Sequence, residues 1–362
     1  MFDTSERPLV LIWEVTQACD LACDHCRADA KPGRHPDELT TTEGKGLLDE
    51  AREFGKGQLV VLSGGDPLKR PDLVDLVDHG TDQGLRMSLT PSGTASLTRE
   101  RVEALADAGL SRMALSIDGA TPEAHDGFRG EEGSFVDTLR AARDAGRAGV
   151  GLQVNTTVCA DTVGELPGIR DRLSRLGVDR WSVFFLVPVG RGRLLEPVAP
   201  ERADSVMDWL HEVRDEERFD VKTTEAPQFR RVGMERAGVS PDEARGGRPS
   251  VLAGDGFAFV SHVGEVYPSG FLPKSAGNVR DESVVDLYRD SDLFSELRDR
   301  SNLRGKCGAC EYRDRCGGSR SRAYAHSGDP FGSDPLCPYV PDGWDAGAAG
   351  DPAPGSETRT AD

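Results

Sequence analysis

The chain has 362 residues, 37% of them hydrophobic, which suffices for two or three domains or for one large barrel with an appendage. Acidic residues outnumber basic residues by 62 to 44, and the net charge of −18 argues against nucleic acid as a partner, because it repels phosphates. No stretch approaches the roughly 18 consecutive apolar residues of a membrane span, and the N-terminus lacks the apolar run of a secretory signal, so we expect a cytoplasmic protein.

Apolar runs and amphipathic stretches alternate through the first half of the chain. Strands that are apolar on both faces, as in a buried parallel sheet, are expected at 9–15, 59–62, 85–89, 113–117, 150–158 and 181–187. Helices are expected between them at 42–54, 73–83, 98–108, 135–148 and 163–176. Six such units in order predict an α/β fold, a partial (β/α)6 barrel similar to a TIM barrel, and a flat doubly wound sheet is the alternative.

The second half of the chain changes in character after a helix expected at 200–213. Residues 257–267 alternate as a strand hairpin does, and residues 301–340 are poor in apolar side chains and rich in Cys, so we expect a metal centre to hold them. The C-terminal stretch has no periodicity and predicts disorder. The predicted division is a barrel at 7–215, a linker region at 216–256, a small domain at 257–341 and a disordered tail at 342–362.

Seven of the eight cysteines fall into two clusters, and a cytosolic chain keeps its thiols reduced. The first cluster, Cys19, Cys23 and Cys26, follows the first strand with C-x3-C-x2-C spacing. Three thiolates can hold three irons of a [4Fe–4S] cube and leave the fourth iron open to a substrate or cofactor. A zinc site completed by His25 is the alternative.

The second cluster has C-x2-C-x5-C-x20-C spacing, and its four members are Cys307, Cys310, Cys316 and Cys337. Four thiolates can close a second [4Fe–4S] centre, and a zinc ribbon is the alternative because zinc also takes four Cys ligands. Cys159 stands apart from both clusters. A lone Cys is more often a small buried hydrophobic residue, so no role is assigned to it.

The three-cysteine loop resembles the signature of the radical S-adenosylmethionine (radical SAM) superfamily. Residues 63–67 resemble the family's GGEP motif with Asp in place of Glu, and residues 116–119 resemble its SxDG motif. The resemblance implies contacts of S-adenosylmethionine with His25, Gly64, Gly65, Asp66, Pro67, Ser116, Asp118, Arg129 and Asn155. It also implies reductive cleavage of S-adenosylmethionine to a 5′-deoxyadenosyl radical, with a reduced ferredoxin or flavodoxin-type protein as electron donor. A plain turn at 64–67 and a surface position for Arg129 are the alternatives.

Residues 316–337 resemble the C-terminal SPASM extension of radical SAM enzymes. A full extension of this kind binds two auxiliary clusters and takes a further Cys from the preceding hairpin, where this chain has Ser269. The resemblance therefore implies a small C-terminal iron–sulfur SPASM-like domain with one auxiliary [4Fe–4S] cluster, and two clusters in the whole chain.

The substrate is indicated less clearly. Stretches at 187–193, 267–273 and 316–322 resemble the haem-biosynthesis branch of this group, whose members remove carboxyl groups or propionate chains from tetrapyrroles. Arg191 and Arg193 are expected at the barrel mouth, where guanidinium groups would bind the carboxylates of a small-molecule substrate such as an iron tetrapyrrole. Pairing of these Arg residues with the protein's own acids is the alternative. The alternative functions are a maturase that modifies ribosomal peptides and a non-enzymatic iron–sulfur scaffold or electron carrier.

No general base and no other catalytic residue can be identified from the sequence. Only seven of the 44 basic residues are Lys, and the combination of many acids with few lysines is typical of halophile proteins. An ordinary acidic enzyme is the alternative interpretation.

Overall fold

The computed structural model describes residues 3–243 and 251–344 and shows a mixed α/β fold built on one ten-stranded sheet. The predicted disordered tail lies outside the described residues, except for its first three positions. The strands are β1 Val10–Thr16, β2 Leu59–Gly64, β3 Arg86–Leu89, β4 Arg112–Ser116, β5 Gly151–Val158, β6 Arg180–Phe185, β7 Asp220–Thr224, β8 Phe257–Val260, β9 Glu265–Tyr267 and β10 Gly277–Asn278. The helices are α1 Thr41–Ala51, α2 Leu73–Asp82, α3 Arg99–Asp107, α4 Pro122–Arg129, α5 Ser134–Arg147, α6 Leu166–Leu176, α7 Pro200–Glu216, α8 Gln228–Ala237, α9 Val284–Asp290, α10 Asp292–Arg298, α11 Gly305–Ala309 and α12 Arg320–Ser327.

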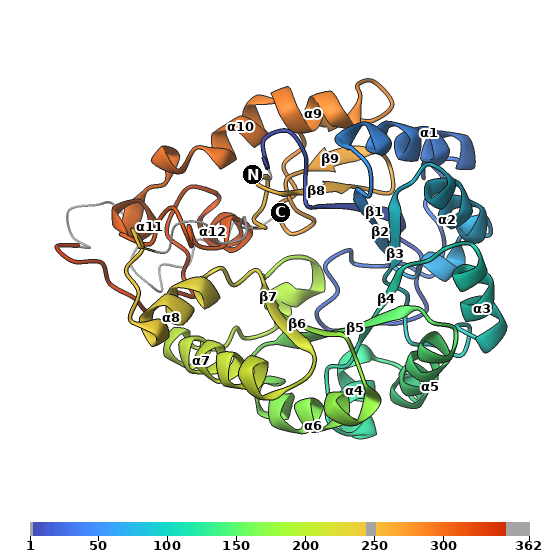
Figure 1. Cartoon of the computed structure of the whole chain (residues 1–362), viewed down its shortest axis with the longest axis horizontal. Helices are drawn as coiled ribbons and strands as arrows, with labels where there is room; N and C mark the ends of the chain where they lie inside the picture. Colours follow the sequence, from blue (N-terminus) through green and yellow to red (C-terminus); the bar gives the residue numbers. More distant parts are fainter. Residues whose placement is uncertain (1–2, 244–250, 345–362) are drawn as a thin grey trace.

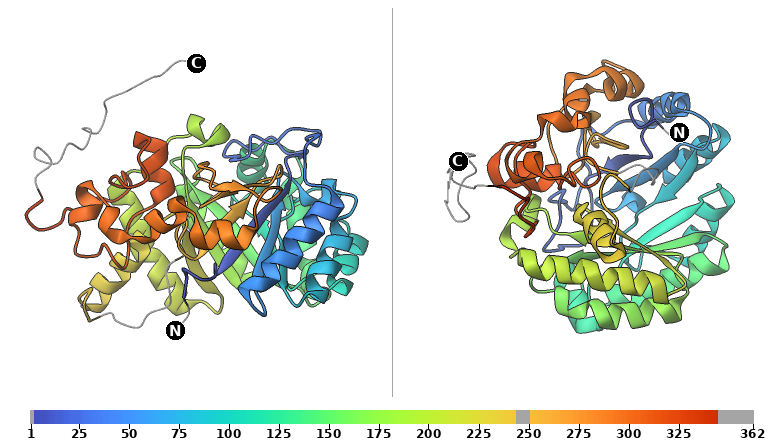
Figure 2. Two further views of the ribbon diagram at one scale, coloured as in Figure 1. Left: turned by 90° about the horizontal axis from the view of Figure 1, so that it is seen from above. Right: turned by 60° about the vertical axis from the view of Figure 1, so that its left-hand side comes forward.

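The sheet curls into a partial barrel with helices on its outer face (Figures 1 and 2). Strands β1 to β6 pair in parallel and in chain order, as the sequence predicts. Strand β7 continues this series beside β6, and β8 returns to pair in parallel with β1. The barrel is not closed, because β7 and β10 are the two edges of the sheet.

The stretch 216–256 differs from the predicted linker, because it contributes β7 and α8 to the barrel. Strand β7 has no apolar run, since Asp220, Lys222 and Thr224 alternate with the buried Val221. The stretch 257–341 likewise begins inside the sheet, with β8. The boundary between barrel and C-terminal segment therefore cannot be read from hydrophobicity.

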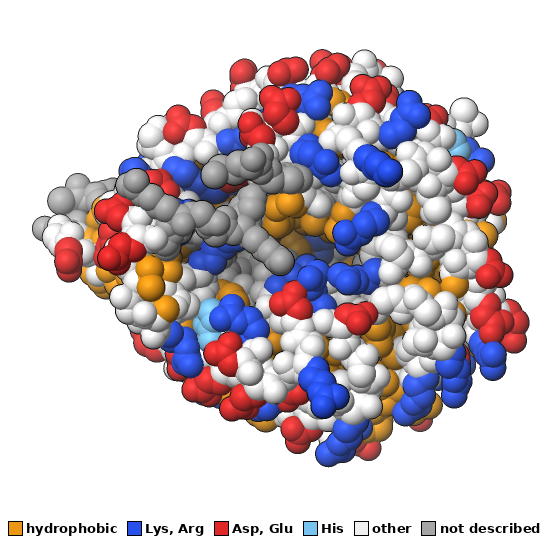
Figure 3. All heavy atoms as spheres, in the orientation of Figure 1, with side chains coloured by type: hydrophobic (Ala, Val, Ile, Leu, Met, Phe, Trp, Pro, Cys, Tyr) orange, Lys and Arg blue, Asp and Glu red, His pale blue; other side chains and the backbone are white. Residues whose placement is uncertain are grey.

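The core lies between the sheet and the outer helices. Trp181 of β6 is fully buried and packs edge-to-face against Trp209 of α7 at 6.1 Å between ring centroids. Because side chains alternate between the two faces of a strand, the neighbours of Trp181 face the barrel interior. Along β5 the outward residues are buried and the inward residues are partly exposed, from Gly151 to Thr157. The barrel interior is therefore hollow, and Figure 3 shows this hollow at the centre of the face it draws.

The C-terminal segment packs against one side of the barrel. The antiparallel pair β8 and β9 extends the sheet, and Tyr288 of α9 packs edge-to-face on Phe54, which follows α1. Helices α11 and α12 lie beside α8 at the side of the barrel opposite α2 and α3 (Figure 1). In the described part of the chain, every helix is too short or too polar to cross a membrane.

Candidate active site and thiol clusters

Cys19, Cys23 and Cys26 come together in the loop that follows β1. Their side chains pack in one cluster with Leu21, and all eight cysteines of the chain are free thiols. The backbone N–H of Leu21 donates to Cys19 Sγ at 3.4 Å, and the N–H of Ala30 donates to Cys26 Sγ at 3.4 Å. The loop thus brings three thiols together, two of them with a backbone donor beside the sulfur, which suits a cluster held by three thiolates.

The glycines of the predicted GGDP motif fit the end of β2 against the beginning of this loop. A Cβ on Gly64 would lie 2.2 Å from the carbonyl oxygen of Thr16, and a Cβ on Gly65 would lie 2.3 Å from that of Ala18. The N–H of Gly65 donates to the Thr16 carbonyl at 2.8 Å. Larger residues would push the two segments apart, so these glycines fix the position of Cys19.

Asp66 of the same motif is fully buried beside this loop. Its Oδ1 accepts from the N–H groups of Leu68 at 3.1 Å and Ser92 at 3.3 Å, whereas Oδ2 is buried without a partner. Burial raises the pKa of Asp66 to about 6. Ser92 also places its hydroxyl 3.4 Å from Cys19 Sγ, a contact that no sequence motif indicated. The next residue of the motif, Pro67, is buried and opens a short 3-10 helix.

The half-buried His25 and the buried Asp118 and Arg129 form a row next to the thiols. Arg129, the last residue of α4, donates through Nη1 to Asp118 Oδ2 at 3.3 Å and to His25 Nε2 at 3.3 Å. His25 stacks on Phe128 at 4.8 Å, and burial lowers the pKa of His25 to about 4, so its ring is neutral at pH 7. His25 Nδ1 and Arg129 Nε have no partner, and both atoms are available to a ligand.

Ser116 and Asn155 pair in register where β4 and β5 approach their carboxyl ends. Both are partly exposed toward the hollow, and Asn155 Oδ1 accepts from Gln153 Nε2 at 2.8 Å. The structure therefore brings the predicted site residues of β2, β4 and β5 to the end of the barrel that carries the cysteine loop.

Arg191 and Arg193, the two residues predicted to bind substrate, lie in different surroundings. Arg191 Nε donates to the carbonyl of Cys23 at 2.8 Å, and its Nη1 pairs with Asp29 at 3.3 Å, so this side chain supports the cysteine loop. The side chain of Arg193 is exposed. Arg191 therefore matches the alternative interpretation, in which these Arg residues pair with the protein's own acids. Its Nη2 is buried without a partner.

A buried charged group that the sequence analysis missed joins the cysteine loop to the β8–β9 hairpin. Glu14 of β1 pairs with Arg27 of the loop, and its Oε1 lies 2.6 Å from His262 Nδ1. Burial opposes ionisation of Glu14, but the charge of Arg27 and the hydrogen bonds from His262 and Arg27 together outweigh it, so the pKa of this carboxyl is lowered. Arg27 also covers the ring of Phe259 at 4.6 Å. The sequence feature that could have indicated this group is Glu14 itself, an acidic residue within a largely apolar strand.

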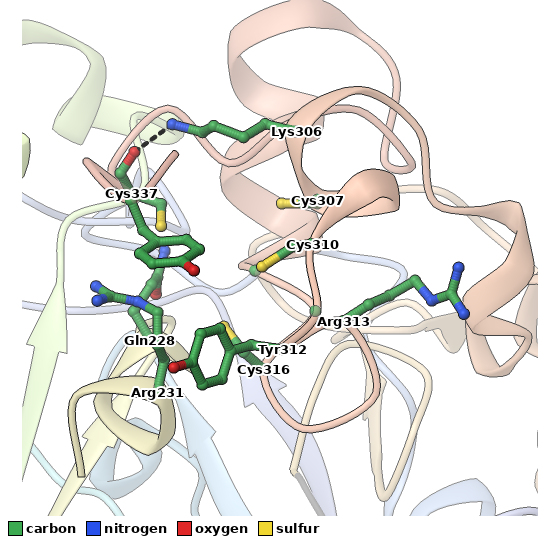
Figure 4. A pocket seen from close by; sticks show the side chains of 12 residues that line it. Gln228, Arg231, Lys306, Cys307, Cys310, Tyr312, Arg313, Cys316 and Cys337 are labelled. Carbon is green, nitrogen blue, oxygen red and sulfur yellow. Dashed lines mark hydrogen bonds between the residues drawn. The ribbon is translucent and has the colours of Figure 1, made fainter. Parts of the chain in front are cut away.

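The four late thiols line one cavity between α8 and the C-terminal segment (Figure 4). The sulfur atoms of Cys307, Cys310 and Cys337 point into the space between them in this view, with Cys316 behind Tyr312. In the ranges 3–243 and 251–344, no three Cys, His, Asp or Glu side chains lie close enough to hold one metal ion. A [4Fe–4S] cube keeps its thiolates farther apart than a single zinc ion does.

Polar groups surround this second set of thiols. The N–H of Asp334 donates to Cys307 Sγ at 3.4 Å, and Arg320 Nη2 lies 3.5 Å from the same sulfur. Burial raises the pKa of Cys337 to about 12, and the nearby charge of Arg231 acts in the opposite direction. Buried thiols of this kind are stabilised as thiolates only by a bound metal centre or by cations, so the cavity fits a cluster.

Ser269, the position where a further Cys ligand was considered, takes part in a hydrogen-bond network instead. Glu225 lies at its centre, accepting from Ser269 at 3.2 Å, from Ser321 at 2.9 Å and from Ser319. Ser269 therefore donates its hydroxyl to Glu225, as Ser319 and Ser321 do, and this position supplies no thiolate ligand.

Known proteins resemble this chain both in sequence and in fold. A model described as the radical SAM superfamily matches residues 13–183. The chain is 39% identical over 348 residues to the AdoMet-dependent heme synthase of Methanosarcina barkeri, with 94% of this chain and 99% of that protein covered. It is 38% identical over 352 residues to the AdoMet-dependent heme synthase of Oleidesulfovibrio alaskensis, with 94% and 89% covered. Among solved structures, Streptococcus suis SuiB bound to S-adenosylmethionine has a TM-score of 0.71 at 17% identity, with 92% and 78% covered, which shows a shared fold.

Proposed function

The chain belongs to the radical SAM superfamily, and we propose that it uses S-adenosylmethionine to decarboxylate a propionate side chain of an iron tetrapyrrole in haem biosynthesis. The relatives named as heme synthases support the haem-related role. The observation on which the proposal depends is the cluster of three thiols with three buried polar atoms beside it that have no partner. These atoms are His25 Nδ1, Asp66 Oδ2 and Arg129 Nε.

The residues at the carboxyl end of the barrel fit the group that the family binds. Cys19, Cys23 and Cys26 would hold three irons of the first cluster. When bound, this cluster and S-adenosylmethionine supply a 5′-deoxyadenosyl radical that abstracts hydrogen. A buried ligand needs partners for its polar atoms, and the unpartnered oxygen of Asp66 and nitrogen of Arg129 are suited to its ammonium and carboxylate groups.

The remaining residues of the row orient these partners. Asp118 accepts from the N–H of Thr157 at 2.7 Å and from Arg129, which holds the guanidinium toward the thiols. The neutral ring of His25 contributes an apolar face stacked on Phe128 and one free nitrogen at its edge. The close packing of Gly64 and Gly65 against the backbone of Thr16 and Ala18 fixes the start of the loop that carries the three thiols.

The C-terminal segment is proposed to be a SPASM-like domain with one auxiliary [4Fe–4S] cluster. Its ligands would be the four thiols that line a common cavity, Cys307, Cys310, Cys316 and Cys337. Conversion of a propionate to a vinyl group releases one hydrogen atom, one CO2 and one electron. The auxiliary cluster would supply an acceptor for that electron, and an external ferredoxin or flavodoxin-type protein would supply the electron that starts the reaction.

The test is anaerobic reconstitution with iron, sulfide, dithionite and S-adenosylmethionine, with iron coproporphyrin III offered as substrate. We expect release of 5′-deoxyadenosine and a product that has lost CO2, detected by mass spectrometry. A variant with Cys19, Cys23 and Cys26 changed to Ser should retain the auxiliary iron and release no 5′-deoxyadenosine. Cys159→Ser is the matched control, since Cys159 belongs to neither thiol cluster and contacts Thr162.

The outcomes separate the alternatives. A wild-type protein with full iron content that never cleaves S-adenosylmethionine would be a scaffold or electron carrier. Cleavage of S-adenosylmethionine without any change in the tetrapyrrole would retain the radical chemistry and refute the proposed substrate.

A further inference from the structure

The hollow of the barrel has two chemically different walls. Strands β1, β2 and β8 turn apolar residues toward it, among them Ile12, Val61 and Phe259, which alternate with the outward-facing core. Strands β5 to β7 turn polar residues toward it instead, including Gln153 and Lys222. An amphiphilic ligand with an apolar plane and charged substituents matches such a pair of walls better than a uniformly polar metabolite does.

Cationic side chains gather where the strands begin. Arg86, Arg112 and Arg180 are the first residues of β3, β4 and β6, and Lys222 is the third residue of β7. Arg86, Arg112 and Arg180 are at the end of the barrel opposite the cysteine loop, because the strands concerned run in parallel. Lys222 lies farther along β7, in register with Ser182, and is close enough to Arg112 and Arg180 for their charges to act on it. Figure 3 views the barrel from this end and shows Lys and Arg side chains around the central hollow.

The local charge is positive although the chain as a whole carries −18. Two carboxylates lie among these cations. Asp220 pairs with Arg180 at 2.8 Å, and Asp179 accepts from the N–H of Leu152 at 2.7 Å. Within this group, four cations against two carboxylates leave an excess of two positive charges.

Two of the cations retain unused hydrogen-bonding capacity. Arg112 Nε is buried without a partner. Lys222 makes no hydrogen bond or ion pair with any residue in the ranges 3–243 and 251–344, although it is more than half buried. Burial and the charges of Arg180 and Arg112 lower the pKa of Lys222 to about 8, and Asp220 opposes this shift. A cation kept in such surroundings costs stability unless a bound anion offsets it.

We propose that Arg112 and Lys222 bind carboxylate groups of the substrate that do not react, at the end of the hollow remote from the cysteine loop. This inference rests on the proposed function and extends it by assigning the acid-binding subsite. Ser116 is four positions after Arg112, about 13 Å at the rise of a β-strand, so a ligand spanning both ends has the size of a macrocycle. The expectation from the sequence had placed carboxylate binding on Arg191 and Arg193 at the opposite end.

The test compares two iron porphyrins, coproporphyrin III with its propionates and octaethylporphyrin without carboxylates. Each is titrated by visible absorption into the reconstituted holoprotein with S-adenosylmethionine bound. We expect Lys222→Met and Arg112→Met each to weaken binding of iron coproporphyrin III by roughly tenfold or more, and to leave binding of iron octaethylporphyrin within about twofold. Lys222→Arg should restore most of the affinity, because it restores the charge.

Arg99→Met on the outer face of α3 is the matched control, since Arg99 is exposed and pairs only locally with Glu103. Its affinity for both porphyrins should equal that of the wild type, and iron content and unfolding temperature show whether each variant is folded. If the wild type binds iron coproporphyrin III and the Lys222 and Arg112 variants bind it equally well, the subsite is refuted while the proposed function stands. If the wild type binds neither porphyrin, the proposed function fails and the subsite with it.

Discussion

Arg322 of α12 connects the C-terminal thiol cavity to the barrel, and its removal provides a quantitative test of this connection. Its Nη1 donates to both carboxylate oxygens of Asp334, at 3.1 and 3.0 Å. Its other donors reach the carbonyls of Leu186 at 3.1 Å and Phe185 at 3.2 Å, at the end of β6, and that of Glu225 after β7. Arg322→Met keeps an unbranched apolar chain at this position and removes every one of these bonds.

The expected cost follows from what remains buried. Asp334 is 0% exposed, and its pKa is lowered because the Arg322 charge and the N–H groups of Ser319 and Leu336 outweigh the effect of burial. Without Arg322 this carboxylate has no ion-pair partner within the described residues, and among charged groups only the more distant Arg320 still favours its ionised form. Breaking a buried ion pair by removing one partner costs about 3–5 kcal/mol. Because the N–H of Asp334 donates to Cys307 Sγ, the cost should be felt first at the second thiol set.

The assay combines urea unfolding of the anaerobically reconstituted protein with iron and sulfide quantification. The wild type should carry about eight irons per chain, and Arg322→Met should retain about four, those of the cysteine loop after β1. The double variant Arg322→Met/Asp334→Asn is the matched control, because it removes the buried charge together with its partner and should regain much of the lost stability. Wild-type iron content and an unchanged unfolding midpoint in Arg322→Met would refute this reasoning.

Three further predictions concern the fold, the ligand row and the cationic hollow. Gly44→Ala places a Cβ 2.3 Å from the buried ring of Trp13 and should lower the free energy of unfolding by about 1–3 kcal/mol. A Cβ at Gly46 of the same helix meets nothing within 4 Å, so Gly46→Ala should raise the free energy of unfolding by about 0.5–1 kcal/mol. Both values are measured by chemical unfolding, and equal effects of the two substitutions would contradict this packing. Arg129→Met should weaken S-adenosylmethionine binding roughly tenfold or more in equilibrium titrations, with Arg129→Lys intermediate, and wild-type affinity in both would refute the assigned contact. The pKa of Lys222 is lowered from 10.5 to about 8, so the unfolded chain binds a proton more readily than the native protein between these values and the stability of the wild type rises with pH there. Lys222→Met should therefore stabilise the substrate-free protein at pH 7, on the order of 1 kcal/mol, by a margin that shrinks toward pH 10, and a margin independent of pH would count against a desolvated ammonium.

The strands of the barrel were predictable because their outward faces are strongly apolar. The sequence had instead been interpreted as strands that are apolar on both faces, whereas in β5 the residues from Gly151 to Thr157 alternate between the core and a hollow. Enough apolar residues remained to mark β1 to β6. In β7 the inward positions are Asp220, Lys222 and Thr224, so the strand has no apolar run and its sequence resembles a polar linker.

The cysteine positions were predictable for a different reason, since ligand spacing along a short loop is a local property of the sequence. The partners that support the loop are not local. Arg191 reaches the Cys23 carbonyl across 168 positions of sequence, and Ser92 reaches Cys19 across 73. A surface Arg and a Ser after a strand carry no pattern of their own, so their roles emerge only when the barrel brings β3 and β6 beside the loop.

The net charge of the chain does not describe the electrostatics of the barrel interior, because exposed and enclosed charges respond differently to salt. Repulsion among the surface carboxylates behind the net charge of −18 is screened within a Debye length of about 3 Å at 1 M salt. Arg112 and Lys222 face a partly enclosed hollow, where ions screen less effectively. High salt therefore relieves the destabilising surface field while it weakens a carboxylate contact inside the hollow much less. The acidic exterior and the cationic interior are thus compatible, and the enclosed position of the cations would allow a strongly acidic protein to bind the proposed polyanionic substrate.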